Sequence, residues 1–142
     1  NCMCIEIQYD TKDIDWQEVP NLLRGVEMGY HTPEIHQRAF EKSHTVVFVK
    51  DDGRLVGFGR AISDGEYQAA IYDVAVSPDC HGRGIGKMIV EAIVSRLPGC
   101  NFVLYASPGK ELFYEKSGFR KMKTGMARFV DMERMKVKGF VE

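Results

Sequence analysis

The sequence predicts a mixed α/β fold, built as one domain around a single, largely antiparallel sheet flanked by helices. Its 142 residues, 44% hydrophobic and 27% charged, are typical of one globular domain. Strand-like runs joined by Asp52-Gly53 and Asp64-Gly65, residues that tolerate positive φ, indicate an antiparallel meander. A glycine-rich turn and an apolar helical stripe that begins at Ile85 then indicate a change from strand to helix.

The N-terminal part of the chain predicts one strand and two helices. Alternating apolar and polar residues predict a strand over Cys4 to Tyr9. The pattern Asp15-x-x-Glu18 is a capping box that begins a helix, with Pro20 as an alternative first residue that would shorten it. Thr32 before Pro33 predicts the second helix start, because the hydroxyl caps free N–H groups and proline suits the first position.

The remaining elements follow from the same kinds of pattern, and the expected order is β-α-α-β-β-β-α-β-α-β-β. Proline and glycine mark the helix ends. The expected strands cover Thr45 to Lys50, Arg54 to Ser63, Gln68 to Val76, Phe102 to Ala106, Phe119 to Met122 and Met126 to Met132. The expected helices run from Ile85 to the Pro98-Gly99 stop and from Pro108 to Gly118.

Composition argues against several classes of partner. The formal net charge is -1, so no overall basic field favours nucleic acid or an anionic membrane surface. No apolar run approaches the roughly 20 residues that span a bilayer, and the first residues show no signal-peptide pattern. The four cysteines, Cys2, Cys4, Cys80 and Cys100, lack zinc-site spacing. Free thiols in a reducing cytoplasm and no bound metal are therefore expected.

The segment from His81 to Lys87 contains three alternate glycines directly before a helix. Free N–H groups and the dipole of a helix start favour an anion, and glycines allow a phosphate to approach the backbone. The segment predicts a phosphate or pyrophosphate cradle, and the alternative is a tight turn with no ligand. A dinucleotide fingerprint fails at Lys87, and a P-loop fails at His81 and Met88.

This segment resembles the acetyl-CoA motif of the GNAT superfamily of N-acetyltransferases, usually written [QR]-x-x-G-x-[GA]. His81 departs from the usual first residue of that motif. The preceding Asp73 to Pro78 is similar to the family's (L/I)-A-V-x-P segment, and Phe113 to Phe119 is similar to its F-Y-x-x-x-G-F ending. Together the three motifs cover most of the chain in the family's order.

The resemblance implies acetyl transfer from acetyl-CoA to an amine, by direct attack within a ternary complex and without an acyl-enzyme. It implies that one strand, which splays from its neighbour, pairs its backbone with the pantetheine arm of the cofactor. The corresponding residues here are Val74, Ala75 and Val76, whose side chains can at the same time belong to the core. The pyrophosphate would be held by Gly82, Arg83, Gly84, Ile85, Gly86 and Lys87.

The resemblance also implies candidates for proton transfer. Tyr114 aligns with the tyrosine that protonates the departing thiolate, and plain aromatic packing is the alternative. The base that deprotonates the amine is either Asp73 or, through water, His31; each could equally have a structural or solvated role. Glu27 and Tyr30, with His31, are expected to line the acceptor pocket. His36 and His44 look less well placed for this chemistry.

Ser107 stands seven residues before Tyr114, where many members have Asn or Asp, so a side-chain contact with the cofactor is not expected from it. A narrower resemblance links Gly59 to Asp64 and Ala69 to Val74 with the branch that includes plastid and cyanobacterial serotonin N-acetyltransferases. It favours a small primary amine as the acceptor. The alternatives are a protein N-terminal or lysine acetyltransferase and a non-catalytic acetyl-CoA-binding module. Met132 and Met135 indicate either a homodimer interface or core packing.

Overall fold

The computed structural model describes residues 4–142, so Cys2 lies outside the described part. The chain forms two compact units, one reaching to Leu104 and one from Tyr105 to Glu142, and each is described by itself. The first unit contains β1 (Ile5–Gln8), α1 (Glu18–Gly25), α2 (Pro33–Glu41), β2 (Thr45–Asp51), β3 (Arg54–Ser63), β4 (Gln68–Val76), the 3-10 turn η1 (Pro78–Cys80), α3 (Ile85–Arg96) and β5 (Asn101–Val103). The second contains α4 (Glu111–Glu115) and α5 (Met132–Val137).

One five-stranded sheet in the order β1-β2-β3-β4-β5 organises the first unit. The first four strands are antiparallel, and β5 pairs with β4 in parallel. Asp52 and Gly53 both have positive φ in the β2–β3 hairpin, as the sequence predicted. The bounds predicted for β3 and β4 are those observed, which confirms the antiparallel meander.

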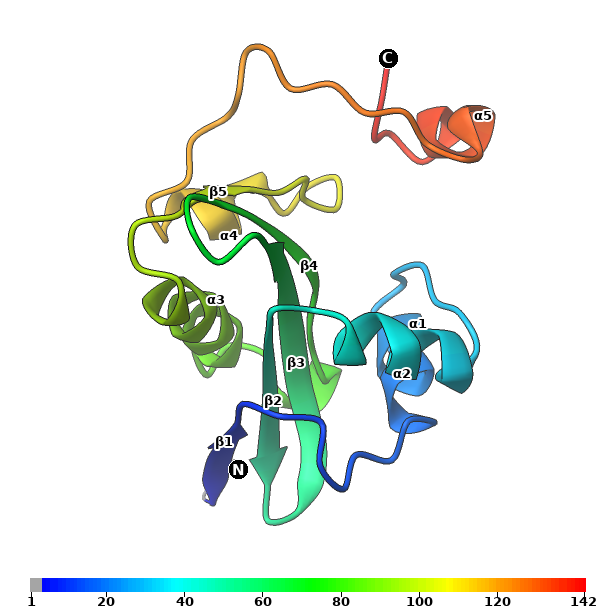
Figure 1. The fold of residues 1–142 in the computed structure, drawn as a ribbon. Helices are drawn as coiled ribbons and strands as arrows, with labels where there is room; N and C mark the ends of the chain where they lie inside the picture. The colour runs from blue at the N-terminus through cyan, green and yellow to red at the C-terminus, as the bar shows by residue number, and fades with distance from the viewer. Residues whose placement is uncertain (1–3) are drawn as a thin grey trace. The chain divides into compact units, whose positions relative to one another are not determined.

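Helices cover both faces of this sheet, with α3 on one side and α1 and α2 on the other (Figure 1). The helix α3 approaches β3 closely because β3 presents Gly57 and Gly59 to it. A Cβ on Gly59 would lie 2.8 Å from Cγ2 of Ile89 in α3. A Cβ on Gly57 would lie 3.0 Å from Cδ1 of Ile89. Side chains at these two positions would push α3 away from the sheet.

The core on the α1 and α2 face is built around aromatic rings. Phe40 of α2 lies 5.2 Å from Phe48 of β2 and 5.8 Å from Phe58 of β3, measured between ring centroids. All three phenylalanines are buried, and Trp16 packs against the first two. Truncating any of these phenylalanines to alanine would cost about 3–5 kcal/mol of stability.

The starts of the two first helices differ in how well they were predicted. The helix α1 begins at Glu18, so both Asp15 and Pro20 were wrong as its first residue. The Asp15 carboxylate instead accepts a hydrogen bond from the N–H of Gln17, in the turn before the helix. The helix α2 begins at Pro33, and the Thr32 hydroxyl accepts a hydrogen bond from the N–H of Ile35, as expected.

In the second unit the two strands predicted at the end of the chain are wrong. No strand is found in residues 119–132, and Met132 begins the helix α5. Asp131 starts that helix, because its carboxylate accepts a hydrogen bond from the N–H of Arg134 at 3.0 Å. The predicted mixed α/β fold and the expected order are confirmed from β1 to α4, and only the two strands after α4 are not found among the described residues. The unit is held together by an aromatic cluster of Tyr105, Phe129 and Phe140, whose ring centroids lie 5.4–6.3 Å apart.

Candidate active site

The strand β4 has a half-open edge toward β5. Its pairing with β5 covers Gln68 to Ala70 and ends there, so residues 73–76 have no strand partner on that side among the described residues. A bulge separates the two halves: the register with β3 shifts between Phe58 and Arg60, and Asp73 of β4 has φ +57°. The backbone of the second half of β4 is therefore available to pair with an extended ligand.

The three residues predicted to hold a cofactor arm lie in this open half. Ala75 is buried in the core on the α1 and α2 face, while Val74 and Val76 are half-buried. The Val74 side chain points to the α3 face, since its Cγ2 lies 3.2 Å from the position of a Cβ on Gly59. The side chains of Val74 and Ala75 thus serve as packing, which leaves the backbone as the part that a ligand can use.

The glycine-rich turn lies between η1 and the start of α3. Gly82 and Gly84 have φ values of +79° and +77°, which other residues rarely adopt, and a Cβ on either would meet no atom within 4 Å. Gly84 is the N-cap residue of α3, and no side chain caps this helix start. The first N–H groups of the helix lack partners within it, so the turn presents free donors to open space.

The other residues of the turn are arranged around that opening. Ile85 is buried and anchors the helix start, and Gly86 lies in the first turn of α3. Arg83 and Lys87 are exposed cations at the positive end of the helix dipole. The Nζ of Lys87 lies 3.9 Å from Oε1 of Glu91, one helical turn further on. The turn therefore combines backbone donors with positive charge, as a pyrophosphate would require.

His81, the residue that departs from the family motif, ties the turn to β4. Its Nε2 lies 2.7 Å from the carbonyl oxygen of Val76, so the ring donates a hydrogen bond to the last residue of the strand. The imidazole thereby joins the open strand edge to the glycine turn. The two parts of the predicted cofactor site are adjacent in the first unit.

Asp73, one of the two predicted bases, forms an ion pair. Its Oδ2 lies 2.7 Å from Nε of Arg60, and both side chains are largely buried, with 23% and 15% exposed. The Arg60 guanidinium lies over the rings of Phe40 and Tyr72 and donates a hydrogen bond to the Ser43 hydroxyl. The pair joins α2, β3 and the bulge of β4, so the structural role that the sequence left open for Asp73 is present.

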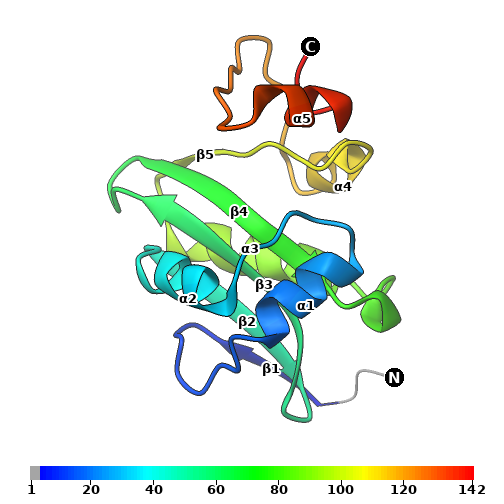
Figure 2. The same cartoon turned by 90° about the vertical axis from the view of Figure 1, so that its right-hand side faces the viewer.

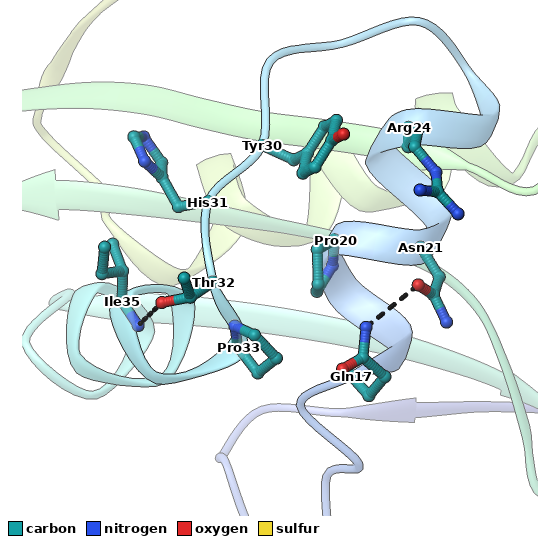
Figure 3. Close-up of a pocket in the computed structure, with 9 residues that line it drawn as sticks. All are labelled: Gln17, Pro20, Asn21, Arg24, Tyr30, His31, Thr32, Pro33 and Ile35. Atoms are coloured by element: carbon teal, nitrogen blue, oxygen red, sulfur yellow. Dashed lines mark hydrogen bonds between the residues drawn. The ribbon is translucent and has the colours of Figure 1, made fainter.

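The predicted acceptor residues belong to the loop between α1 and α2, which crosses one face of the sheet (Figure 2). Tyr30 and His31 line a pocket of about 460 Å³ between the two helices, and Glu27 is not part of its lining. In Figure 3, Asn21 and Arg24 of α1, with Gln17 just before that helix, lie on the wall of the pocket opposite His31 and Thr32. The Arg24 guanidinium lies 6.0 Å from the Tyr30 ring centroid.

His36, which looked poorly placed in the sequence, is the histidine that the fold buries. Its side chain is 3% exposed, and its Nε2 accepts a hydrogen bond from the backbone N–H of His31 at 2.8 Å. Burial, the largest influence, lowers the pKa of His36, and the charges of His31 and Arg60 act in the same direction, while Asp73 opposes them. The spacing of four residues from buried Phe40 is the signal that could have placed His36 on the inner face of α2.

Tyr114 lies in α4, within the second unit. Its ring packs edge-to-face on Phe113 and Phe119, with centroids 4.9 and 5.9 Å away. Burial raises the pKa of the Tyr114 phenol above its ordinary value, so the hydroxyl keeps its proton at neutral pH. Ser107 belongs to the turn before this helix, where its carbonyl accepts a hydrogen bond from Lys110 N–H.

Comparison with known proteins agrees with this architecture. The model of the Acetyltransferase (GNAT) family matches residues 9–119 of the chain. Serotonin N-acetyltransferase 2, chloroplastic, of Oryza sativa subsp. japonica is 41% identical over 91 residues, which are 58% of this chain and 45% of that protein. An uncharacterized N-acetyltransferase, ycf52, of Porphyra purpurea is 32% identical over 126 residues, which are 82% of this chain and 71% of that protein.

The solved structures agree as well. A crystal structure of an acetyltransferase assigned to the GNAT family from Xanthomonas campestris pv. campestris has a TM-score of 0.79 and 27% identity, and covers 92% of this chain and 96% of that one. The chain thus belongs to the GNAT family of acetyltransferases, as its motifs predicted. It spans about half the length of the rice relative.

Members of this family use acetyl-CoA as co-substrate, and the residues present fit that molecule. The open edge of β4 suits an extended pantetheine arm, and the space above Gly82 and Gly84 suits a pyrophosphate. In the part of the chain that the structure describes, no group of three His, Cys, Asp or Glu side chains is arranged to hold a metal ion. Across residues 4–142, no helix has both the length and the apolar character needed to cross a membrane.

Proposed function

We propose that this chain transfers an acetyl group from acetyl-CoA to the primary amine of a small molecule. The observation that carries this proposal is the open half-edge of β4, which is joined through His81 to a glycine turn with free backbone donors. Val74, Ala75 and Val76 would pair with the pantetheine arm, and the turn from Gly82 to Lys87 would hold the pyrophosphate. Such backbone donors can also polarise the thioester carbonyl.

The chemistry needs one base and one acid from the chain. When bound, acetyl-CoA supplies a thioester: the amine nitrogen forms the new C–N bond as the C–S bond breaks. Asp73, or His31 through a water, would accept the proton that the amine loses. Tyr114 would give its phenolic proton to the departing sulfur. The Tyr114 hydroxyl is protonated at neutral pH, as this role requires, because burial raises the pKa of a phenol that already ionises well above that pH.

A small amine is favoured over a protein by two observations. The rice relative, which is 41% identical over 91 residues, is named as an N-acetyltransferase of serotonin, a primary amine with an aromatic ring system. The pocket between α1 and α2 presents Tyr30, an aromatic side chain that is 49% exposed, beside His31. A cytoplasmic location and a homodimer remain predictions; the name of the rice protein places that relative in the chloroplast.

The test is acetylation of an amine panel, read by mass spectrometry so that cysteine thiols do not interfere. The panel spans arylalkylamines, polyamines, aminoglycosides, amino acids and peptides, and compares the natural chain with Tyr114→Phe and Tyr67→Phe. Tyr67 is the matched control because it is an exposed tyrosine in the β3–β4 turn. We expect one small-amine class to be acetylated, with kcat reduced about 100-fold in Tyr114→Phe and unchanged in Tyr67→Phe.

Other outcomes would redirect the assignment. Acetylation of peptides alone would replace the small amine by a protein acceptor. Binding of acetyl-CoA without any product across the panel would favour a non-catalytic binding module. Failure to bind acetyl-CoA would overturn the proposed function itself.

A further inference from the structure

His36 is a buried imidazole that serves as a hydrogen-bond acceptor. It lies in the first turns of α2, its side chain is 3% exposed, and its Nε2 accepts the N–H of His31 at 2.8 Å. A backbone N–H can only donate, so Nε2 must carry a free lone pair and the ring must be neutral, with its proton on Nδ1. An imidazolium could not accept this bond.

The bond fixes the half of the α1–α2 loop that lines the pocket. The first half is tied back to α1 by backbone hydrogen bonds, among them Met28 N–H to the Leu23 carbonyl at 2.9 Å. Glu27 then turns the chain with φ +62°. For the backbone of residues 29–31, the hydrogen bond found in the described structure is the one from His31 to His36. Tyr30 and His31 are therefore held in the pocket wall mainly through this single acceptor.

Charged and titratable groups surround the His36 ring on three elements. His31 approaches from the loop, with ring centroids 5.7 Å apart. The positive charge of Arg60 on β3 disfavours a protonated His36 ring, and the negative charge of Asp73 on β4 favours it. Burial outweighs the attraction of Asp73 and lowers the pKa of His36, so the ring is neutral around neutral pH.

We propose that His36 is a positioning residue for the acceptor amine: its neutral ring holds Tyr30 and His31 in the pocket wall, and protonation of the ring releases them. This inference rests on the proposed function, because it assigns the loop to the acceptor side. In this role His36 touches neither the amine nor the thioester, and it acts on the acceptor pocket through the backbone of His31. It also gives the acceptor side of the site a sensitivity to acid.

The first arm of the test does not depend on activity. In ¹H–¹⁵N NMR spectra from pH 8 to 5, the His31 amide signal should shift upfield as the His36 ring takes up a proton. His36→Gln supplies an amide oxygen that accepts the same bond at every pH, so this shift should be absent. His31→Gln is the matched control: it removes the other imidazole but keeps the backbone N–H, so the shift should persist. A His31 amide that ignores the titration of His36 overturns the proposal.

The second arm measures kinetics with the amine identified by the panel. At each pH, KM for the amine in the natural chain is divided by KM for the amine in His36→Gln. This ratio should be about fivefold higher at about pH 5.5 than at about pH 7.5, because the natural chain loses one net hydrogen bond when the ring is protonated. Protonation of the amine itself cancels in this ratio. KM for acetyl-CoA should not differ between the two chains. A constant ratio for the amine, or an equal change for acetyl-CoA, overturns the positioning role. If no amine is acetylated at all, the proposed function fails, and the NMR arm alone decides on the hydrogen bond.

Discussion

The glycine turn with β4 and the loop between α1 and α2 are two walls of the proposed site, and they are built in different ways. The first consists of backbone: positive φ at Gly82 and Gly84, an uncapped helix start and an unpaired strand edge. The second consists of side chains held by a loop, with Tyr30 and His31 positioned through His36. Backbone recognition leaves a pattern of glycines in the sequence, whereas recognition by side chains leaves residues whose partners only the fold reveals.

The largest expected effect concerns the ion pair between Arg60 and Asp73, which joins β3 to the bulge of β4. Arg60→Leu would leave Asp73 largely buried without its partner, at a cost of about 3 kcal/mol of unfolding free energy. The matched control is Arg54→Leu, which removes an exposed ion pair with Asp79 at 2.9 Å and should cost under about 1 kcal/mol. Urea unfolding measures both values. Equal losses in the two variants would mean that the Arg60 pair does not support the bulge of β4.

A second prediction separates ligand binding from backbone strain in the glycine turn. Gly84→Ala and Gly53→Ala both place a Cβ at positive φ, and each should lose about 1 kcal/mol of stability. Gly53 lies in the β2–β3 hairpin, away from the turn. Calorimetry should find acetyl-CoA binding about tenfold weaker in Gly84→Ala, because the methyl group enters the space proposed for the pyrophosphate, and unchanged in Gly53→Ala. Comparable affinity in the two variants would remove the turn from the cofactor site.

The smallest effect is the pH dependence of stability from His36. Its pKa is lowered in the folded chain, so below about pH 6.5 the unfolded chain binds the proton more readily. The contribution of the neutral His36 ring to the free energy of unfolding is therefore fully present above that pH. It declines as the pH falls toward the pKa of His36 in the folded chain. His36→Gln should show a shallower fall in Tm between pH 7 and 5 than the natural chain. His44→Gln, which changes an exposed histidine, should keep the full slope.

The sequence predicted the elements whose signals are local. The strand β3 lies between two Asp-Gly turns and β4 follows the second of them. Thr32 before Pro33 begins α2 through its own hydroxyl, so no distant contact is needed to place these elements. The last strands failed because a strand depends on a partner. Met126 to Met132 looked like a strand, but Asp131 caps a helix instead, and Met132 and Met135 are spaced as one face of α5.

The same distinction applies to the site residues. The glycines of the turn were predicted because their spacing before a helix has one main physical explanation. Asp73 was proposed for its place beside the cofactor strand, and its ion pair with Arg60, 13 residues away, depends on strand register. His36 was passed over because a lone histidine in a polar helix start resembles a solvated residue. Its spacing of four residues from Phe40 was the available sequence signal, and the packing of α2 against the sheet shows that it is buried.

The central claim is that the backbone of β4 and the glycine turn hold acetyl-CoA, and hydrogen exchange tests it most directly. We would compare amide exchange of the chain with and without saturating acetyl-CoA, read by mass spectrometry of short peptides. The predicted result is slower exchange at residues 73–76 and 82–87, with little change at residues 68–70, whose edge β5 already covers. Protection confined to the α1–α2 loop, or no protection in β4, would contradict the claim.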